Sequence, residues 1–263
     1  MIRRVLPACV ALFFFVAGAA AAAQADKPQP PKYGPAGAPY AAPLGQSPGY
    51  FQSPEHPAPD FWALIAHYTG QDNDLSCSTA AVAMVLNAIA GTGGGLRAAD
   101  QNFDPTRLAA EVRAVHWKER LSKRGWQGRR GLTLDELAEV TAAALTTYGL
   151  RDWKVSYRSF PAATPGALEE LRAILAENEA SADDFVILHF QQDILTDDPG
   201  GPYAHISPVG AYDAAAGRVL ILDVDRKYYG PYWVGAGRLL RAVSATTPSH
   251  GRGGLVLVRK ISR

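Results

Sequence analysis

The chain has 263 residues, which is the size of one large domain or two small ones. Hydrophobic residues make up 48% of it and charged residues only 19%, so it can build a core and is not a disordered polyelectrolyte. A net charge of +1 excludes a strongly basic nucleic-acid-binding protein, and two cysteines are too few for a disulfide-stapled scaffold.

The first 25 residues have the pattern of a secretory signal peptide. Arg3 and Arg4 precede an apolar run from Val5 to Ala23, and residues 23–25 read Ala-Gln-Ala, a small-residue cleavage site. This pattern predicts secretion across the inner membrane into the periplasm, with no membrane attachment after cleavage. The alternative is an uncleaved anchor, because the apolar run is nearly long enough to span a bilayer.

Cleavage would change both the charge and the cysteine content. The net charge becomes −1 because Arg3 and Arg4 leave, and Cys77 becomes the sole cysteine because Cys9 leaves with them. A single cysteine cannot form an internal disulfide. It is either a small buried hydrophobic residue or a nucleophile, and the count alone favours neither.

The mature chain is expected to begin with an arm and continue as one folded domain. Residues 26–49 are rich in proline, alanine and glycine, which predicts an extended arm before a domain over 50–263. Within the domain, helical periodicity, a capping box and proline at a first helical position predict helices over 61–68, 77–91, 105–114 and 116–124, and helices opened by Thr133 and by Thr164. The helix over 77–91 is apolar on nearly all sides, so it should be central and buried.

The second half of the sequence changes to short apolar runs separated by Gly, Pro and Asp. These runs predict strands over 185–190, 205–212, 218–224, 232–234 and 255–259, with a weaker strand around Val155 and Tyr157. Helices followed by an antiparallel sheet indicate an α+β fold.

Cys77 stands at the start of the buried helix. Unpaired backbone N–H groups and the helix dipole favour a negative charge there, which is the environment of a thiolate nucleophile. A cysteine nucleophile needs a histidine base and a group that orients it. Of the six histidines, His205 is the best candidate base, because it opens a strand directly after a Gly/Pro-rich loop.

The hairpin over 205–224 supplies the third group. If its turn centres on Ala214, His205 lies directly opposite Asp223, and opposed side chains of an antiparallel pair share a face. A slip of the register would put Val224 or Asp225 there instead. Gln71, six residues before Cys77, could donate to an oxyanion together with the Cys77 backbone N–H, although a glutamine in a turn is usually only polar filler.

These residues and their order resemble the papain-like cysteine proteases, and more closely the phytochelatin synthases. The resemblance covers about residues 50–260 and rests on Gln71 and Cys77 and on the blocks 85–88 (VLNA), 131–137 (GLTLDEL), 205–212 (HISPVGAY), 220–226 (LILDVDR) and 228–234 (YYGPYWV). The chain departs from the family pattern at Ser78, where a glycine commonly follows the nucleophile. It also ends without a cysteine-rich C-terminal domain, which is similar to the short bacterial form.

The resemblance implies a papain-like fold and a catalytic domain over 50–263 that acts on glutathione. Cys77 would cleave the cysteinyl–glycine amide through a γ-glutamylcysteinyl thioester, with His205 and Asp223 completing a triad. Arg226 and Tyr229 match positions associated with substrate binding. No tightly bound cofactor is implied, but cadmium or zinc would be activators or glutathione-thiolate partners. The oligomeric state stays open, a homodimer included.

The thioester could be resolved by water or by a second glutathione. We expect mainly water, which gives γ-glutamylcysteine and glycine. The loop before His205 would repel an anionic second glutathione, because it carries amides and carboxylates and no cation: Gln191, Gln192, Asp193, Asp197 and Asp198. Two other interpretations remain. One is an exported papain-like peptidase or amidase on other peptides. The other is a non-enzymatic metal- or thiol-binding protein, which the lack of a C-x-x-C or paired-histidine motif disfavours.

Overall fold

The computed structural model of the chain describes residues 40–93 and 102–261. The expected signal peptide over 1–25, and residues 26–39 of the expected arm, lie outside the described residues. No helix in the described part is long and apolar enough to cross a membrane.

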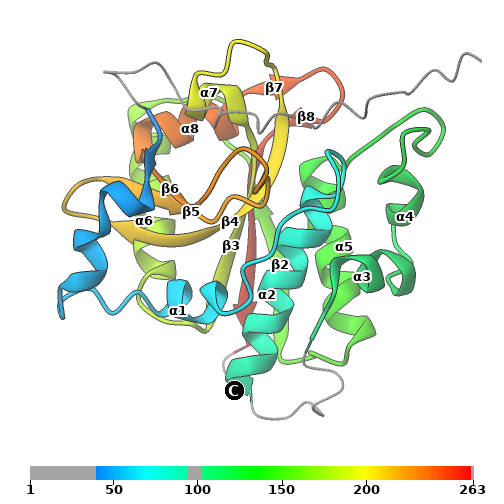
Figure 1. Cartoon of the computed structure of the whole chain (residues 1–263), viewed down its shortest axis with the longest axis horizontal. Helices are drawn as coiled ribbons and strands as arrows, with labels where there is room; N and C mark the ends of the chain where they lie inside the picture. Colours follow the sequence, from blue (N-terminus) through cyan, green and yellow to red (C-terminus); the bar gives the residue numbers. More distant parts are fainter. Residues whose placement is uncertain (1–39, 94–101, 262–263) are drawn as a thin grey trace, which may run out of the picture.

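The first half of the described chain is helical, as its periodicity predicts. Two short 3-10 helices, η1 (Leu44–Gln46) and η2 (Pro48–Gln52), come before α1 (Pro59–Ile65), α2 (Cys77–Gly93), α3 (Pro105–Glu111), α4 (Trp117–Arg120) and α5 (Leu134–Thr147). Helix α2 has no polar face, so it can only be accommodated inside the molecule. It packs against α1, α3, α5 and strand β4 (Figure 1).

The second half builds a seven-stranded antiparallel sheet. Its strands, in sheet order, are β1 (Ala42–Pro43), β6 (Tyr232–Gly235), β5 (Arg218–Ile221), β4 (Ala204–Asp213), β3 (Asp184–Gln191), β9 (Gly254–Lys260) and β2 (Trp153–Arg158). A separate two-stranded hairpin joins β7 (Thr246–Thr247) to β8 (Gly251–Arg252). The predicted α+β class is confirmed.

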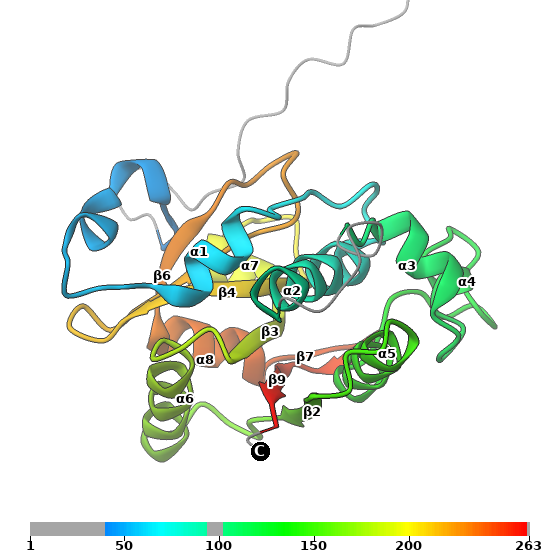
Figure 2. The ribbon, with the colours of Figure 1, turned by 90° about the horizontal axis from the view of Figure 1, so that it is seen from below.

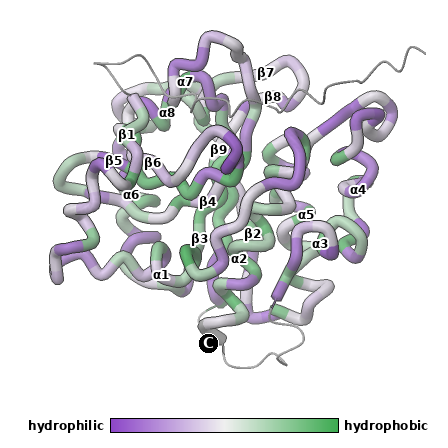
Figure 3. Tube along the Cα trace, in the orientation of Figure 1, coloured by the Kyte–Doolittle hydropathy of each residue, from purple (hydrophilic) through white to green (hydrophobic). Residues whose placement is uncertain are grey.

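The sheet has a core on each face. Along β3, Phe185 and Ile187 belong to the core shared with α2 and α5, whereas Val186, Leu188 and Phe190 belong to the core on the other face. This alternation follows from the two-residue period of a strand. Helices α6 (Pro165–Asn178) and α8 (Ala236–Ser244) cover the second face (Figure 2). Hydrophobic stretches gather where α2 meets β3 and β4 (Figure 3).

The described end of the expected arm is not a free extended segment: it contains the short strand β1, which is part of the sheet, followed by η1 and the start of η2. Ala42 pairs with Trp233 and Pro43 with Tyr232, so β1 forms an edge strand beside β6. The Leu44 N–H donates to the Pro231 carbonyl at 2.8 Å. Residues 40–49 are therefore attached to the domain.

The predicted register of the hairpin was wrong, because the turn centres between Ala215 and Ala216 instead of on Ala214; a β-bulge then shifts the pairing by one residue. Asp213 lies opposite Arg218, but Val209 lies opposite Ile221, so Gly210 is an extra residue in β4. A Cβ at Gly210 would come within 2.8 Å of the Leu222 side chain. Continued past the bulge, this register puts Asp223 beside Ser207, two residues along β4 from His205 and therefore on the same face.

Two helices were not predicted from the sequence. Helix α7 (Gln192–Thr196) has five residues, too few to show a helical period, and α8 follows β6 with no loop between them. The missed helix α7 matters for the candidate site described below, because its first residue, Gln192, is one of the buried residues of that site.

Candidate active site

Cys77 is the first residue of α2 and is partly exposed, as a free thiol. The residues on either side of it hold the helix start in place. Thr79 Oγ1 donates to the Ser76 carbonyl at 2.9 Å, and the Trp117 indole N–H donates to Ser78 Oγ at 2.9 Å. Ser78, the departure from the family pattern, therefore ties the nucleophile helix to α4.

His205 is buried near the start of β4 and faces Cys77. Its Nε2 lies 2.9 Å from Asp223 Oδ1 and 3.1 Å from Ser207 Oγ. Burial opposes a charge on the imidazole, but the charge and hydrogen bond of Asp223 and a hydrogen bond with Cys77 outweigh it and raise the pKa of His205 well above its usual value. Because Nε2 is occupied by Asp223, Nδ1 is the nitrogen left for the thiol.

Asp223 has no solvent exposure and accepts four hydrogen bonds. Oδ1 accepts from His205 and, at 2.8 Å, from the Asp225 N–H. Oδ2 accepts from Gln192 Nε2 and from the Tyr232 hydroxyl, both at 2.9 Å. Sequence reasoning missed Gln192 and Tyr232. The sequence did contain a signal for them. Gln192 directly follows one apolar strand and Tyr232 begins another, and a polar side chain buried at such a position needs a hydrogen-bond partner.

Gln71 lies beside this pair through its backbone. Its N–H donates to the Val224 carbonyl at 2.7 Å, and its side-chain Oε1 is buried without a hydrogen-bond partner. Amide oxygen and nitrogen are interchangeable in such an assignment. An amide end without a partner next to His205 is what an oxyanion donor requires before substrate binds.

A cavity of about 300 Å³ opens beside His205 and Gln71. Its lining is mainly polar and includes three carboxylates: Gln71, Asp74, Gln192, Asp198, Tyr203, Ala204, His205, Asp225, Tyr228 and Tyr229. Of the two predicted substrate-binding residues, Tyr229 lines this cavity. Arg226 does not; it is exposed, and its guanidinium carbon lies 4.9 Å from the centre of the Tyr68 ring.

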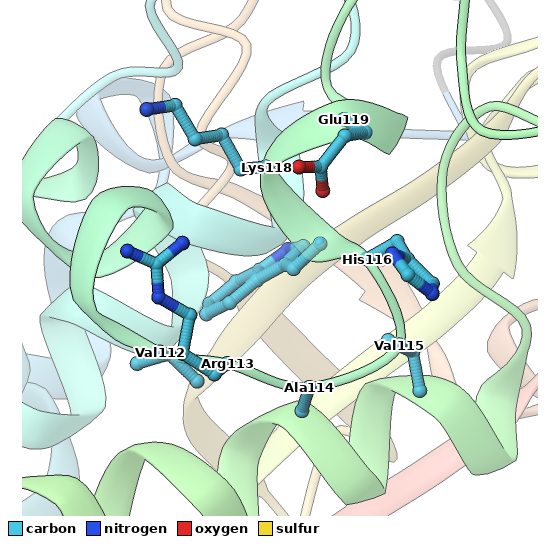
Figure 4. A pocket seen from close by; sticks show the side chains of 8 residues that line it. Val112, Arg113, Ala114, Val115, His116, Lys118 and Glu119 are labelled. Carbon is cyan, nitrogen blue, oxygen red and sulfur yellow. The ribbon is translucent and has the colours of Figure 1, made fainter.

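A second cavity, of about 270 Å³, lies in the turn over residues 112–119. Arg113 and Lys118 point to one side of this turn and His116 and Glu119 to the other (Figure 4). Val115 and His116 have left-handed backbones, with φ of 44° and 55°, which a β-branched valine rarely adopts. The His116 ring stacks on Trp126 at 3.7 Å, which helps to hold this conformation.

Two of the blocks on which the family resemblance rests have structural explanations. Asn87 of the VLNA block donates to and accepts from the Phe103 backbone at 3.0 and 2.7 Å, fixing α2 to the chain before α3. In the GLTLDEL block, Glu136 accepts from the Thr133 N–H at 2.9 Å, the predicted capping box of α5. Among the described residues no group of three His, Cys, Asp or Glu side chains is placed to hold a metal ion.

Comparison with known proteins places these features in a family. A family model for phytochelatin synthase matches residues 48–253. Glutathione gamma-glutamylcysteinyltransferase 1 of Lotus japonicus is 25% identical over 193 residues, covering 73% of this chain and 34% of its own length. The protein of the same name from Arabidopsis thaliana is 24% identical over 208 residues, with coverages of 77% and 38%. The chain thus spans little more than a third of these relatives.

Among solved structures, the Pseudomonas avirulence protein AvrPphB aligns with 76% of this chain and 100% of its own. The TM-score is 0.31 and the sequence identity 9%.

Proposed function

Because the chain belongs to the phytochelatin synthase family, we propose that it transfers the γ-glutamylcysteinyl group of glutathione through a thioester on Cys77. The observation that carries the proposal is His205, whose Nε2 lies 2.9 Å from Asp223 Oδ1 and whose pKa is raised by both Asp223 and Cys77. This is the arrangement that a cysteine nucleophile, its base and an orienting carboxylate require.

In the first half of the reaction the Cys77 sulfur attacks the carbonyl carbon of the cysteinyl–glycine amide. His205, protonated because its pKa is raised, gives a proton to the glycine nitrogen as the carbon–nitrogen bond breaks. Gln71 and the Cys77 backbone N–H hold the oxyanion of the tetrahedral intermediate. Glycine leaves and the γ-glutamylcysteinyl thioester remains.

In the second half, water attacks the thioester carbonyl carbon and gives a proton to His205. The carbon–sulfur bond then breaks, which releases γ-glutamylcysteine and restores Cys77 as a thiolate beside the protonated imidazole. We propose water as the main acceptor because three carboxylates, Asp74, Asp198 and Asp225, line the cavity beside His205, and its lining residues include no lysine or arginine. An anionic second glutathione is disfavoured in such a cavity. Asp193 and Asp197 contribute less to this argument, since Asp193 accepts a hydrogen bond from Gln191 and Asp197 pairs with Arg238 of α8.

For the first glutathione, we propose that Tyr229 contacts the substrate from the cavity wall. Arg226 would have to leave the Tyr68 ring to bind a substrate carboxylate, so it serves as an adjustable cation at the rim. We further propose that cadmium or zinc enters as a glutathione thiolate, and that the segment 1–25 directs the chain to the periplasm.

Product analysis tests the proposal. Purified protein and its Cys77→Ala variant are incubated with millimolar glutathione, with and without cadmium, and the products are identified by mass spectrometry. We expect γ-glutamylcysteine and glycine from the unaltered chain and none from Cys77→Ala. Dominant (γ-Glu-Cys)n-Gly would show that glutathione is the acceptor instead of water. Release of no glycine, with cleavage of other peptides or amides, would favour the peptidase alternative.

A further inference from the structure

The second carboxylate oxygen of Asp223 is held as firmly as the first. An ionised carboxylate offers about four acceptor positions, and here all four are filled by protein donors. Oδ1 serves His205, while Oδ2 takes the Gln192 amide and the Tyr232 hydroxyl and touches no reacting group. The two donors to Oδ2 therefore serve a purpose other than contact with substrate.

These donors are themselves fixed. Tyr232 is fully buried in β6, and burial together with the neighbouring Asp223 raises the pKa of its hydroxyl well above the usual value, so it remains a donor. Gln192 is buried at the start of α7, and its backbone N–H donates to the Tyr203 carbonyl at 2.8 Å. Water cannot readily replace the Tyr232 donor, because that side chain has no solvent exposure, and Gln192, although it borders the cavity, is only 5% exposed.

The need for such donors follows from the side chain. The terminal torsion of an aspartate is broad, so the backbone alone does not decide which oxygen faces the imidazole. We propose that Tyr232 and Gln192 are positioning residues, which fix the rotation of Asp223 so that Oδ1 points at His205 Nε2. The proposal deepens the proposed function, but its first test needs no glutathione.

Coupling to Asp223 separates this role from a merely structural one. Tyr232→Phe, Asp223→Ala and the double variant are compared in the rate at which iodoacetamide alkylates Cys77 at pH 7. We expect Tyr232→Phe to slow alkylation about tenfold, which corresponds to the loss of one charge-assisted hydrogen bond. In the Asp223→Ala background, the same substitution should have almost no effect on the rate. Gln192→Met should behave in the same way.

The control is Tyr148→Phe. The Tyr148 hydroxyl also donates to a carboxylate, that of Glu111 at 2.9 Å, but neither residue is close to the triad in sequence or shares a hydrogen bond with it in the described part of the chain. It should leave alkylation unchanged. Equal losses from Tyr232→Phe with and without Asp223, or no loss at all, would overturn the positioning role. Coupling observed in alkylation, without any cleavage of glutathione, would leave this inference standing and reject the proposed function.

A second measurement covers the case in which Asp223→Ala does not fold. The proton between His205 Nε2 and Asp223 should give a low-field NMR signal. In Tyr232→Phe this signal should move further downfield, because one donor fewer shares the carboxylate charge. In Tyr148→Phe it should stay in place. An unmoved signal in Tyr232→Phe contradicts the proposal.

Discussion

At the scale of single residues, Gln71 is the clearest case in which position decides role. Its side-chain Oε1 is buried without a hydrogen-bond partner, and the residue lines the same cavity as His205. Gln71→Ala should lower kcat for glutathione cleavage by roughly 10²–10³ with little change in KM, because an oxyanion exists only in the transition state. An unchanged kcat in steady-state kinetics would return Gln71 to being a loop residue.

Asp60 is a buried acid far from this chemistry. It has no solvent exposure, contacts Asn178, and burial, reinforced by Asp184 and Glu179, raises its pKa to about 10. The folded chain therefore keeps a proton that the unfolded chain loses near pH 4. Stability is full below pH 4 and falls as pH rises towards 10, by at most about 1.4 kcal/mol per unit.

Asp60→Asn removes this titration. The free energy of unfolding is measured with urea at pH 5 and at pH 7 for both proteins. Between these pH values it should fall by about 2 kcal/mol more for the native chain than for the variant. Equal slopes with pH for the two proteins would mean that Asp60 is ionised in the folded state.

At the scale of elements, the start of α5 depends on a buried ion pair. Arg120 Nη1 lies 2.5 Å from Glu136 Oε2, and both side chains are largely buried. Glu136→Ala would leave the Arg120 cation buried without its carboxylate, so we expect a loss of about 3 kcal/mol in thermal or urea unfolding. Glu139→Ala, on the exposed face of the same helix, should change stability by less than about 0.5 kcal/mol.

The elements also show what sequence reasoning could reach. The helix opened by Thr133 and the buried helix at Cys77 were predictable, because capping and periodicity are local properties. The hairpin register was not, because the residues between Asp213 and Arg218 do not reveal where the turn is centred, and the bulge at Gly210 leaves no local signal. Gln192 seemed to be a loop residue, because its partner Asp223 is 31 residues away in sequence.

At the scale of the whole molecule, charge is unevenly distributed. Residues 113–130, here called the basic segment, carry six exposed cations: Arg113, Lys118, Lys123, Arg124, Arg129 and Arg130. Within the described chain only Arg129 of these forms an ion pair, with Glu136 at 3.3 Å. The segment adjoins the nucleophile helix through the hydrogen bond from Trp117 to Ser78.

An anionic substrate such as glutathione should be attracted to this basic surface, which adjoins the start of the nucleophile helix. The double variant Arg113→Glu/Lys118→Glu should therefore lower kcat/KM several-fold at low salt, and the loss should disappear near 0.5 M salt as screening sets in. Arg151→Glu/Lys154→Glu, at the β2 edge of the sheet, is the matched control. Identical salt dependence in both variants would show that the basic segment does not attract substrate.

The edge strand β1 also constrains the order in which the chain can fold. β1 pairs with β6, and Ser47 accepts from Arg218, 171 residues later. The strand edge of β6 and the Arg218 side chain of β5 are in place to receive this segment only after β4, β5 and β6 have assembled. Closing so long a loop is also slow. The segment over residues 42–47, although made before all of these strands, is thus among the last to dock. Because Pro43 lies beside Tyr232, the donor to Asp223, the triad gains its final support only when β1 docks against β6.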